Sequence, residues 1–147
     1  MSPDLSTPPD GADIPLPPDA APESGHTGRI LYARVRPNED LVQTIEKLCL
    51  QHGFAHAVVR GSLGSLSQCC LELHTGARVD VPGPAVEMLT LMGEVRTEGG
   101  APQARISGTV ADPVGRIFAG RFVPGRNPVC ITFEINLEEW LVDSPIA

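Results

Sequence analysis

Apolar and polar residues alternate along most of this chain, a pattern typical of strands in a half-buried sheet. One segment follows a different period: between Asn38 and Gly53 the apolar residues Leu41, Val42, Ile45, Leu48 and Cys49 fall on one face of a helix. The pattern therefore predicts one helix and about seven strands. The strands are expected at residues 29–36, 54–60, 68–74, 86–93, 103–111, 116–123 and 129–137.

The ends of the predicted helix carry their own signals. Asn38 is expected to be the N-cap, and Glu39 and Asp40 are expected in the first turn, where the helix dipole favours acids. Gly53 provides a C-terminal stop. Since the strands are mostly joined by hairpins, we predict an α/β fold of the α+β type, with a mostly antiparallel sheet covered by one main helix.

Two stretches are expected to interrupt the sheet. Residues 61–66 (GSLGSL) read as a turn-rich link between two strands, and Pro82, Gly83 and Pro84 read as a break before the strand that starts at Val86.

The first 28 residues differ from the rest of the chain. They hold seven of the 15 prolines, five acidic residues and no Lys or Arg. A segment of this composition buries too little apolar surface to offset the entropy of ordering, unless it lies as an extended arm across a neighbouring surface. We therefore expect an acidic, Pro-rich tail over 1–28 and one domain over 29–147. No run reaches the ~20 apolar residues of a membrane span, which predicts a cytoplasmic protein without membrane contact.

Charge argues against a grip on nucleic acid by a single chain. The formal net charge is −7, Lys47 is the one lysine, and the ten arginines are scattered along the sequence. A protein that binds DNA through phosphates needs clustered cations. DNA contact would require an oligomer that gathers arginines, or a partner.

Four motifs, taken in order, resemble the PPC domain (the plants and prokaryotes conserved domain) across residues 29–140. They are RPNEDL at 36–41, GSLGSL at 61–66, VEMLTLMG at 86–93, and a series from Arg105 through Ala111-Asp112, Gly115 and Ala119-Gly120-Arg121 to Phe133-Glu134-Ile135. The resemblance implies a curved, mostly antiparallel sheet, assembly as a homotrimer, and the DNA-binding label given to prokaryotic relatives. In plants the domain is joined to an AT-hook, whose Arg-Gly-Arg-Pro core is absent here.

A departure from the family's pattern bears on metal chemistry. Many prokaryotic relatives carry His-x-His and Gly-Gly-His segments that look like a metal site near the subunit interface, whereas this chain has Arg105-Ile106-Ser107 and Ala119-Gly120-Arg121. Guanidinium groups stay protonated and cannot ligate a cation. We predict no metal and no cofactor, with zinc through another set, such as His56 with Cys69, as an alternative.

The replaced positions suggest an anion site instead. Arg105 and Ser107 lie two residues apart and so face one side of their strand, and Arg121 is on the next strand. Two guanidinium groups beside a hydroxyl suit a carboxylate or a phosphate. Alternatively, Arg105 and Arg121 pair with Glu87, with Glu134 or with an acid of the next subunit, or they lie solvated. Arg60 joins either the anion site or the pairing with acids.

Glu87 lies on an apolar strand, where a buried carboxylate would need a cationic partner. An interfacial pair between Glu87 and an arginine is therefore the leading alternative to the anion site. Saturation of the arginines by acids would favour this alternative, and a cleft without an acid would favour the anion site.

No Ser/His/Asp or Cys/His order predicts a catalytic set. The sequence thus favours a non-catalytic homotrimeric module, DNA-binding or transcription-associated, that acts in regulation through assembly and partner contacts. The alternative is a small-anion binding protein or enzyme whose site lies at the subunit interface.

Overall fold

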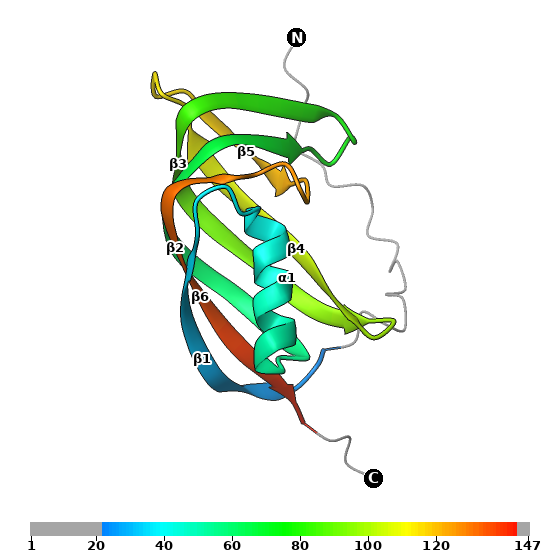
Figure 1. Ribbon diagram of the computed structural model, residues 1–147. Helices are drawn as coiled ribbons and strands as arrows, with labels where there is room; N and C mark the ends of the chain where they lie inside the picture. The colour runs from blue at the N-terminus through cyan, green and yellow to red at the C-terminus, as the bar shows by residue number, and fades with distance from the viewer. Residues whose placement is uncertain (1–21, 144–147) are drawn as a thin grey trace, which may run out of the picture.

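The computed structural model describes residues 22–143, which form one helix and six strands (Figure 1). The elements in chain order are β1 (Gly25–Val35), α1 (Leu41–His52), β2 (His56–Glu72), β3 (Arg78–Glu98), β4 (Ala101–Ala111), β5 (Ile117–Phe122) and β6 (Val129–Val142).

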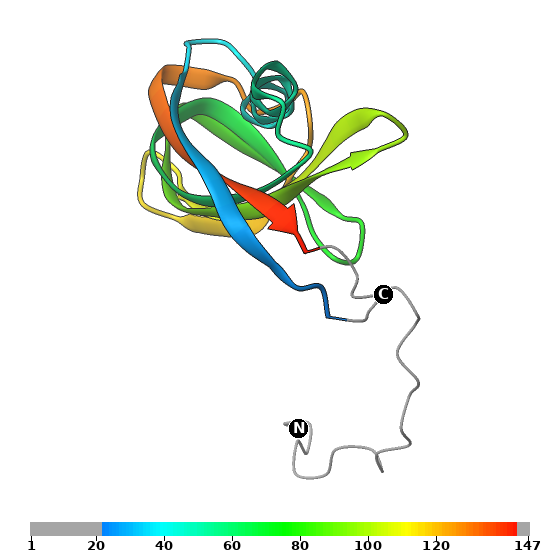
Figure 2. The same cartoon turned by 90° about the horizontal axis from the view of Figure 1, so that it is seen from below.

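The six strands form one sheet in the order β1-β6-β2-β3-β4-β5, and all its strand pairs are antiparallel. The end of β2 also pairs with β5, so that β2, β3, β4 and β5 make a closed ring of paired strands. Figures 1 and 2 show α1 against one side of the sheet, and the described ends of the chain side by side, where Gly25 pairs with Val142. The prediction of a mostly antiparallel α+β fold with one helix is confirmed.

The sheet has six strands rather than about seven, because the expected link at 61–66 lies inside β2. Gly61 and Gly64 have φ angles of 73° and 153°, and the register with β6 shifts on both sides of this stretch. A Cβ atom at Gly64 would collide with the carbonyl oxygen of Thr132 on β6. These glycines therefore allow bulges and a close strand approach within one long strand, where the sequence pattern suggested a turn.

The expected break at Pro82–Pro84 is also wrong, since β3 continues through it. Leu66 pairs with Val86 and Gln68 pairs with Pro82, with a register shift between them. A proline is tolerated in a strand at such a bulge, because the ladder there does not need its missing N–H group.

Helix α1 forms as predicted but starts differently. Asp40 is the N-cap: its carboxylate accepts a hydrogen bond from the Gln43 N–H at 2.9 Å and another from the Asn127 N–H at 2.8 Å. Asn38 has a left-handed φ of 66°, and no acid lies in the first turn. The contact with the loop before β6 fixes Asp40 in an extended conformation, so the helix begins after it. Gly53 is the predicted C-cap.

The core fills the space between α1 and the sheet. The predicted helix face is buried at Leu41, Val42, Ile45 and Cys49, while Leu48 packs at its edge. At 12 residues α1 is too short to cross a membrane, and residues 22–143 contain no helix that could. Most of the expected tail, residues 1–21, and its possible docking lie outside the described residues, whereas residues 25–28 belong to β1.

Candidate functional site

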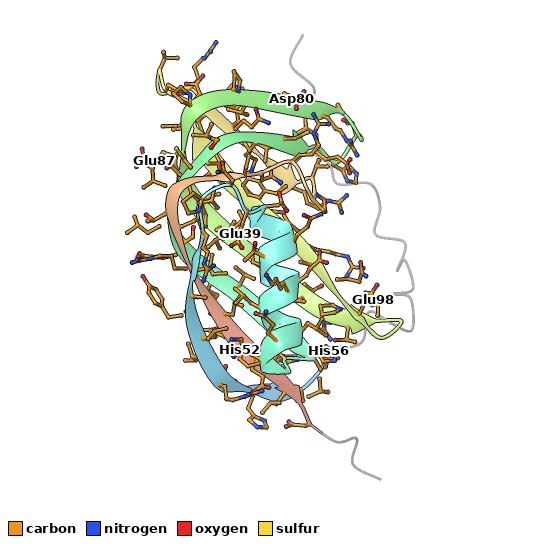
Figure 3. All side chains as sticks on the ribbon, in the orientation of Figure 1. Glu39, His52, His56, Asp80, Glu87 and Glu98 are labelled. Atoms are coloured by element: carbon orange, nitrogen blue, oxygen red, sulfur yellow. The ribbon has the colours of Figure 1, made fainter. Side chains whose placement is uncertain are left out.

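The structure distributes the five predicted site residues over three places. Arg105 and Ser107 lie on β4 with Arg121 on β5, Glu87 lies on β3, and Arg60 lies on β2. Figure 3 shows Glu87 pointing outward at one side of the molecule, opposite the β3–β4 hairpin that carries Glu98.

Ser107 and Arg121 are direct cross-strand partners on β4 and β5. Arg121 lines two hollows. One, of about 260 Å³, contains Arg105, Arg121 and Arg78 in its lining, and the other, a shallower one of about 440 Å³, contains Ser107 and Arg121. The predicted neighbourhood therefore exists, but Arg105 and Ser107 do not line the same hollow.

Glu72 lines both hollows and pairs with two of the arginines. Its carboxylate accepts hydrogen bonds from Arg121 Nη2 at 2.7 Å and from Arg78 Nε at 3.2 Å. The bond from Arg121, followed by the bond from Arg78, holds the pKa of Glu72 below its usual range. Glu72 stays ionised and neutralises part of the positive charge that was expected to attract an external anion.

Arg105 also has acidic partners within the chain. Its Nη2 donates to Glu98 Oε1 at 3.1 Å, and its Nη1 lies 3.7 Å from Glu94 Oε1. Glu94 lies directly opposite Arg105 in the β3–β4 ladder, and Glu98 is at the end of the same strand. Both acids are therefore close enough to pair with Arg105. The expected pairing of the arginines with acids is present, but with other acids than those named from the sequence.

Glu87 is exposed on β3 in the single chain, so a partner for it at a subunit interface stays a prediction. It lines an open groove of about 620 Å³ together with Leu63, Ser65, Asp112 and Glu134. Within residues 22–143, no arginine pairs with Glu87. The strand looks apolar in the sequence because Leu89 and Met92 on its exposed side are apolar too, in addition to the side chains that face the core.

Glu134, the second expected partner, is bound elsewhere. It accepts hydrogen bonds from Arg34 Nη2 at 2.8 Å and from the Tyr32 hydroxyl at 2.9 Å, both on β1. These bonds, Arg34 first, lower the pKa of Glu134. Glu134 thus ties β1 to β6 and does not contact Arg105 or Arg121.

Arg60 belongs to a third location, at the far end of β2. Its Nε lies 3.0 Å from Glu138 Oε2, and it lines a hollow of about 220 Å³ with Arg96, His56 and Trp140. Glu23, from the residues before β1, binds at the edge of this hollow to Arg96 and Trp140. This cluster could not be predicted from local pattern, because 117 residues separate Glu23 from Trp140.

A further feature of the surface is a set of exposed apolar side chains on strand faces turned away from the core. Tyr32 and Leu63 are each 70% exposed, and Met92 is 65% exposed. The pairs Arg60–Met92 and Ser65–Glu87 fix the register of β2 against β3 and place Leu63 opposite Leu89. Leu89 is exposed as well. These four residues, Tyr32, Leu63, Leu89 and Met92, are called the apolar sheet face below.

No group of three or more His, Cys, Asp and Glu side chains in the described part of the chain is arranged to hold a metal ion. The histidines His56 and His74 line different hollows. The arginines at 105 and 121 leave the family's expected metal positions without imidazole ligands.

Residues 22–141 match the family model of the Plants and Prokaryotes Conserved (PCC) domain, also abbreviated PPC. The chain is 31% identical over 117 residues to the bifunctional protein GlmU of a Synechococcus strain, a match that spans 80% of this chain. A second Synechococcus GlmU is 30% identical over 97 residues. The chain covers only about a sixth of the length of these relatives, 17% and 15%.

Three solved structures share the fold. The PPC protein of Pyrococcus horikoshii has a TM-score of 0.71 at 22% identity, over 84% of this chain and 85% of that one. A metal-containing protein of Archaeoglobus fulgidus has a TM-score of 0.73 at 17% identity, over 85% and 89%. A putative DNA-binding protein of Bacteroides thetaiotaomicron has a TM-score of 0.67 at 13% identity, over 78% and 83%.

Proposed function

Because the chain belongs to the Plants and Prokaryotes Conserved (PCC) domain family, we propose that it is a non-catalytic, cytoplasmic homotrimeric module that acts in DNA-associated or transcription-associated regulation through assembly and partner contacts. The observation that carries this proposal is the apolar sheet face.

Exposed apolar side chains that gather on one surface favour association, because burying them releases water. The apolar sheet face supplies Leu63 and Met92, which α1 does not cover and which are 70% and 65% exposed. Closed symmetric association would bury this surface on every subunit. The pairing of β5 back onto β2 supports a curved sheet, whose outer surface neighbouring subunits would contact.

The arginines support action through partners. Apart from Arg36, every arginine forms an ion pair with an acid of the described residues. A guanidinium group that is already paired gains less from a phosphate, since the acid must first be displaced. The module would therefore need a partner protein, or cations gathered by assembly, to hold DNA.

The occurrence of a similar segment within a much longer protein, GlmU, supports the interpretation as a module. We carry none of that protein's activity over to this chain.

A DNA titration tests the functional part of the proposal. Fluorescence anisotropy of a labelled random 20-base-pair duplex would be measured against the wild type and the uncharged variant Leu63→Gln at two salt concentrations. We expect wild-type binding no tighter than the roughly 10⁻⁴ to 10⁻⁶ M of non-specific contacts, weakening with salt, and none for the variant. Sub-micromolar binding by both proteins would contradict a role that depends on assembly and partners.

One observation favours a second function, a small-anion site. Arg78, Arg105 and Arg121 line one hollow of about 260 Å³ and share it with a single carboxylate, Glu72. Thermal unfolding with phosphate and with carboxylates, for the wild type and Arg121→Ala, tests this candidate. A concentration-dependent rise in Tm that the variant loses would support it. No rise with any of these anions would remove it.

A further inference from the structure

The carboxylate of Glu23 lies in a set of hydrogen-bond donors from distant parts of the chain. Trp140 Nε1 donates to Glu23 Oε1 at 2.7 Å, and Arg96 Nη1 lies 2.9 and 3.2 Å from the two carboxylate oxygens. Glu23 comes from the segment before β1, Arg96 from β3 and Trp140 from β6. The indole and the guanidinium together form what is called the Arg96–Trp140 seat.

Arg96 is held in position independently of Glu23. Its Nε donates to Glu94 Oε2 at 3.2 Å, and its Nη1 lies 3.3 Å from Nδ1 of His56, the residue directly opposite in the β2–β3 ladder. The Arg96 side chain is only 31% exposed. A guanidinium that is fixed and partly desolvated binds a carboxylate more strongly than a mobile surface arginine does.

Trp140 adds selectivity for an acceptor. An indole N–H group can only donate, so it suits a carboxylate oxygen and not a cation. The bonds from Trp140 and then Arg96 lower the pKa of Glu23, in agreement with a seat that prefers the charged form.

A hollow of about 220 Å³ opens beside the seat. Val58 and Trp140 contribute apolar surface to its wall, and the Arg60–Glu138 ion pair lies in the same lining. The hollow has room for a small apolar body attached to a carboxylate group at the seat.

We propose that the Arg96–Trp140 seat is a carboxylate-binding site, that Glu23 fills it in cis, and that a carboxylic acid with a small apolar body occupies the seat and the adjacent hollow when Glu23 leaves. Because Glu23 is tethered, its effective concentration at the seat is on the order of millimolar or higher. An external carboxylate must therefore compete with the chain's own side chain.

The experiment uses Trp140 as its reporter, since this is the one tryptophan of the chain. Cyclohexanecarboxylate is titrated into the full chain and into Glu23→Ala, and tryptophan fluorescence is recorded. Sodium chloride keeps the ionic strength constant. We expect a saturable change for Glu23→Ala with a Kd in the millimolar range, and at least a tenfold weaker response for the wild type. Cyclohexanecarboxamide, which has the same body without the charge, is expected to give none.

Two further variants complete the test. Asp80→Ala removes a different exposed acid, which pairs with Arg126 at 3.3 Å, and should behave like the wild type. Glu23→Ala/Arg96→Gln should lose the saturable change while its circular dichroism stays unchanged. The comparison of Glu23→Ala with the wild type stands even if the double variant does not fold, because Glu23 precedes the first strand. A flat titration of Glu23→Ala, or an equal response to the amide, would overturn the proposal.

Discussion

Arg121 and Glu72 face each other across the β5–β2 pair, with Arg121 Nη2 2.7 Å from Glu72 Oε1. This ion pair lies where the ring of paired strands closes. In this pair the guanidinium of Arg121, which was expected from the sequence to bind an external anion, is bound to Glu72 instead. The same contact therefore supports the fold and limits the chemistry of the β4–β5 surface.

Removing the carboxylate should release this limit. In Glu72→Gln, Arg121 and Arg78 lose their shared acceptor, so phosphate should raise the Tm of this variant more than that of the wild type. Differential scanning fluorimetry over a phosphate series measures the difference. Asp80→Asn, which removes an acid from a single surface pair, is the matched control. Equal phosphate effects in all three proteins would show that Glu72 does not compete with anions.

The bulge inside β2 gives a test of the fold. Gly64→Ala places a Cβ against the carbonyl of Thr132 at a φ of 153°, which should cost about 2 to 4 kcal/mol of unfolding free energy. Gly61→Ala in the same strand has open space at its Cβ and a φ of 73°, and should cost only about 1 kcal/mol. Urea unfolding compares the two, and equal costs would argue against the close approach of β2 and β6.

The start of α1 can be tested in the same way. Asp40→Ala loses the bonds to the Gln43 and Asn127 N–H groups and should destabilise the protein by about 1 to 2 kcal/mol. Asn38→Gly should cost less than about 0.5 kcal/mol, because Asn38 has a left-handed φ of 66° that glycine adopts freely. If Asn38→Gly were the more damaging change in urea unfolding, Asn38 would be the cap after all.

The pair between Arg29 and Glu139 should make stability depend on pH. Arg29 donates from its backbone N, Nε and Nη2 to the Glu139 carboxylate at 3.0, 3.1 and 2.9 Å, which lowers the pKa of Glu139 below its ordinary 4.5. The folded state thus favours the ionised form. The contribution of the Arg29–Glu139 pair to the free energy of unfolding is complete well above pH 4.5. It disappears as the pH falls through the lowered pKa of Glu139 in the folded state.

The measurement is the difference in unfolding free energy between the wild type and Glu139→Gln from pH 7 down to pH 3. The difference should be largest at neutral pH and should shrink in acid. A difference that does not change with pH would mean that the ionised carboxylate is not what Arg29 stabilises.

Local pattern was sufficient for α1, because its apolar spacing and Gly53 are signals within one segment. It was insufficient at 61–66, since the glycines there serve contacts with β6 that the sequence does not display. Local pattern favours Asn38 as the N-cap. It does not reveal that Asp40 is held by Asn127, because these two residues are 87 positions apart in the sequence.

The candidate site shows the same contrast between local signals, which the sequence displays, and contacts between distant segments, which it does not. The neighbourhood of Ser107 and Arg121 could be predicted because one hairpin joins their strands. The partner Glu72 could not, because it depends on the β2–β5 pairing, and the Arg96–Trp140 seat depends on three separate elements. The exposure of Glu87 in the single chain could not be predicted, because the composition of a strand does not tell which of its side chains face the core.

The most direct test of the central proposal is the mass of the protein in solution, measured by sedimentation equilibrium for the wild type, Leu63→Lys and Leu50→Lys. Leu63 belongs to the apolar sheet face, and Leu50 is almost equally exposed, at 67%, but lies on α1. We predict about 47 kDa, three times the 15.6 kDa of the chain, for the wild type and Leu50→Lys, and a shift toward 15.6 kDa for Leu63→Lys. A wild type that sediments at 15.6 kDa, or a Leu63→Lys variant that keeps the full mass, would contradict assembly through this face.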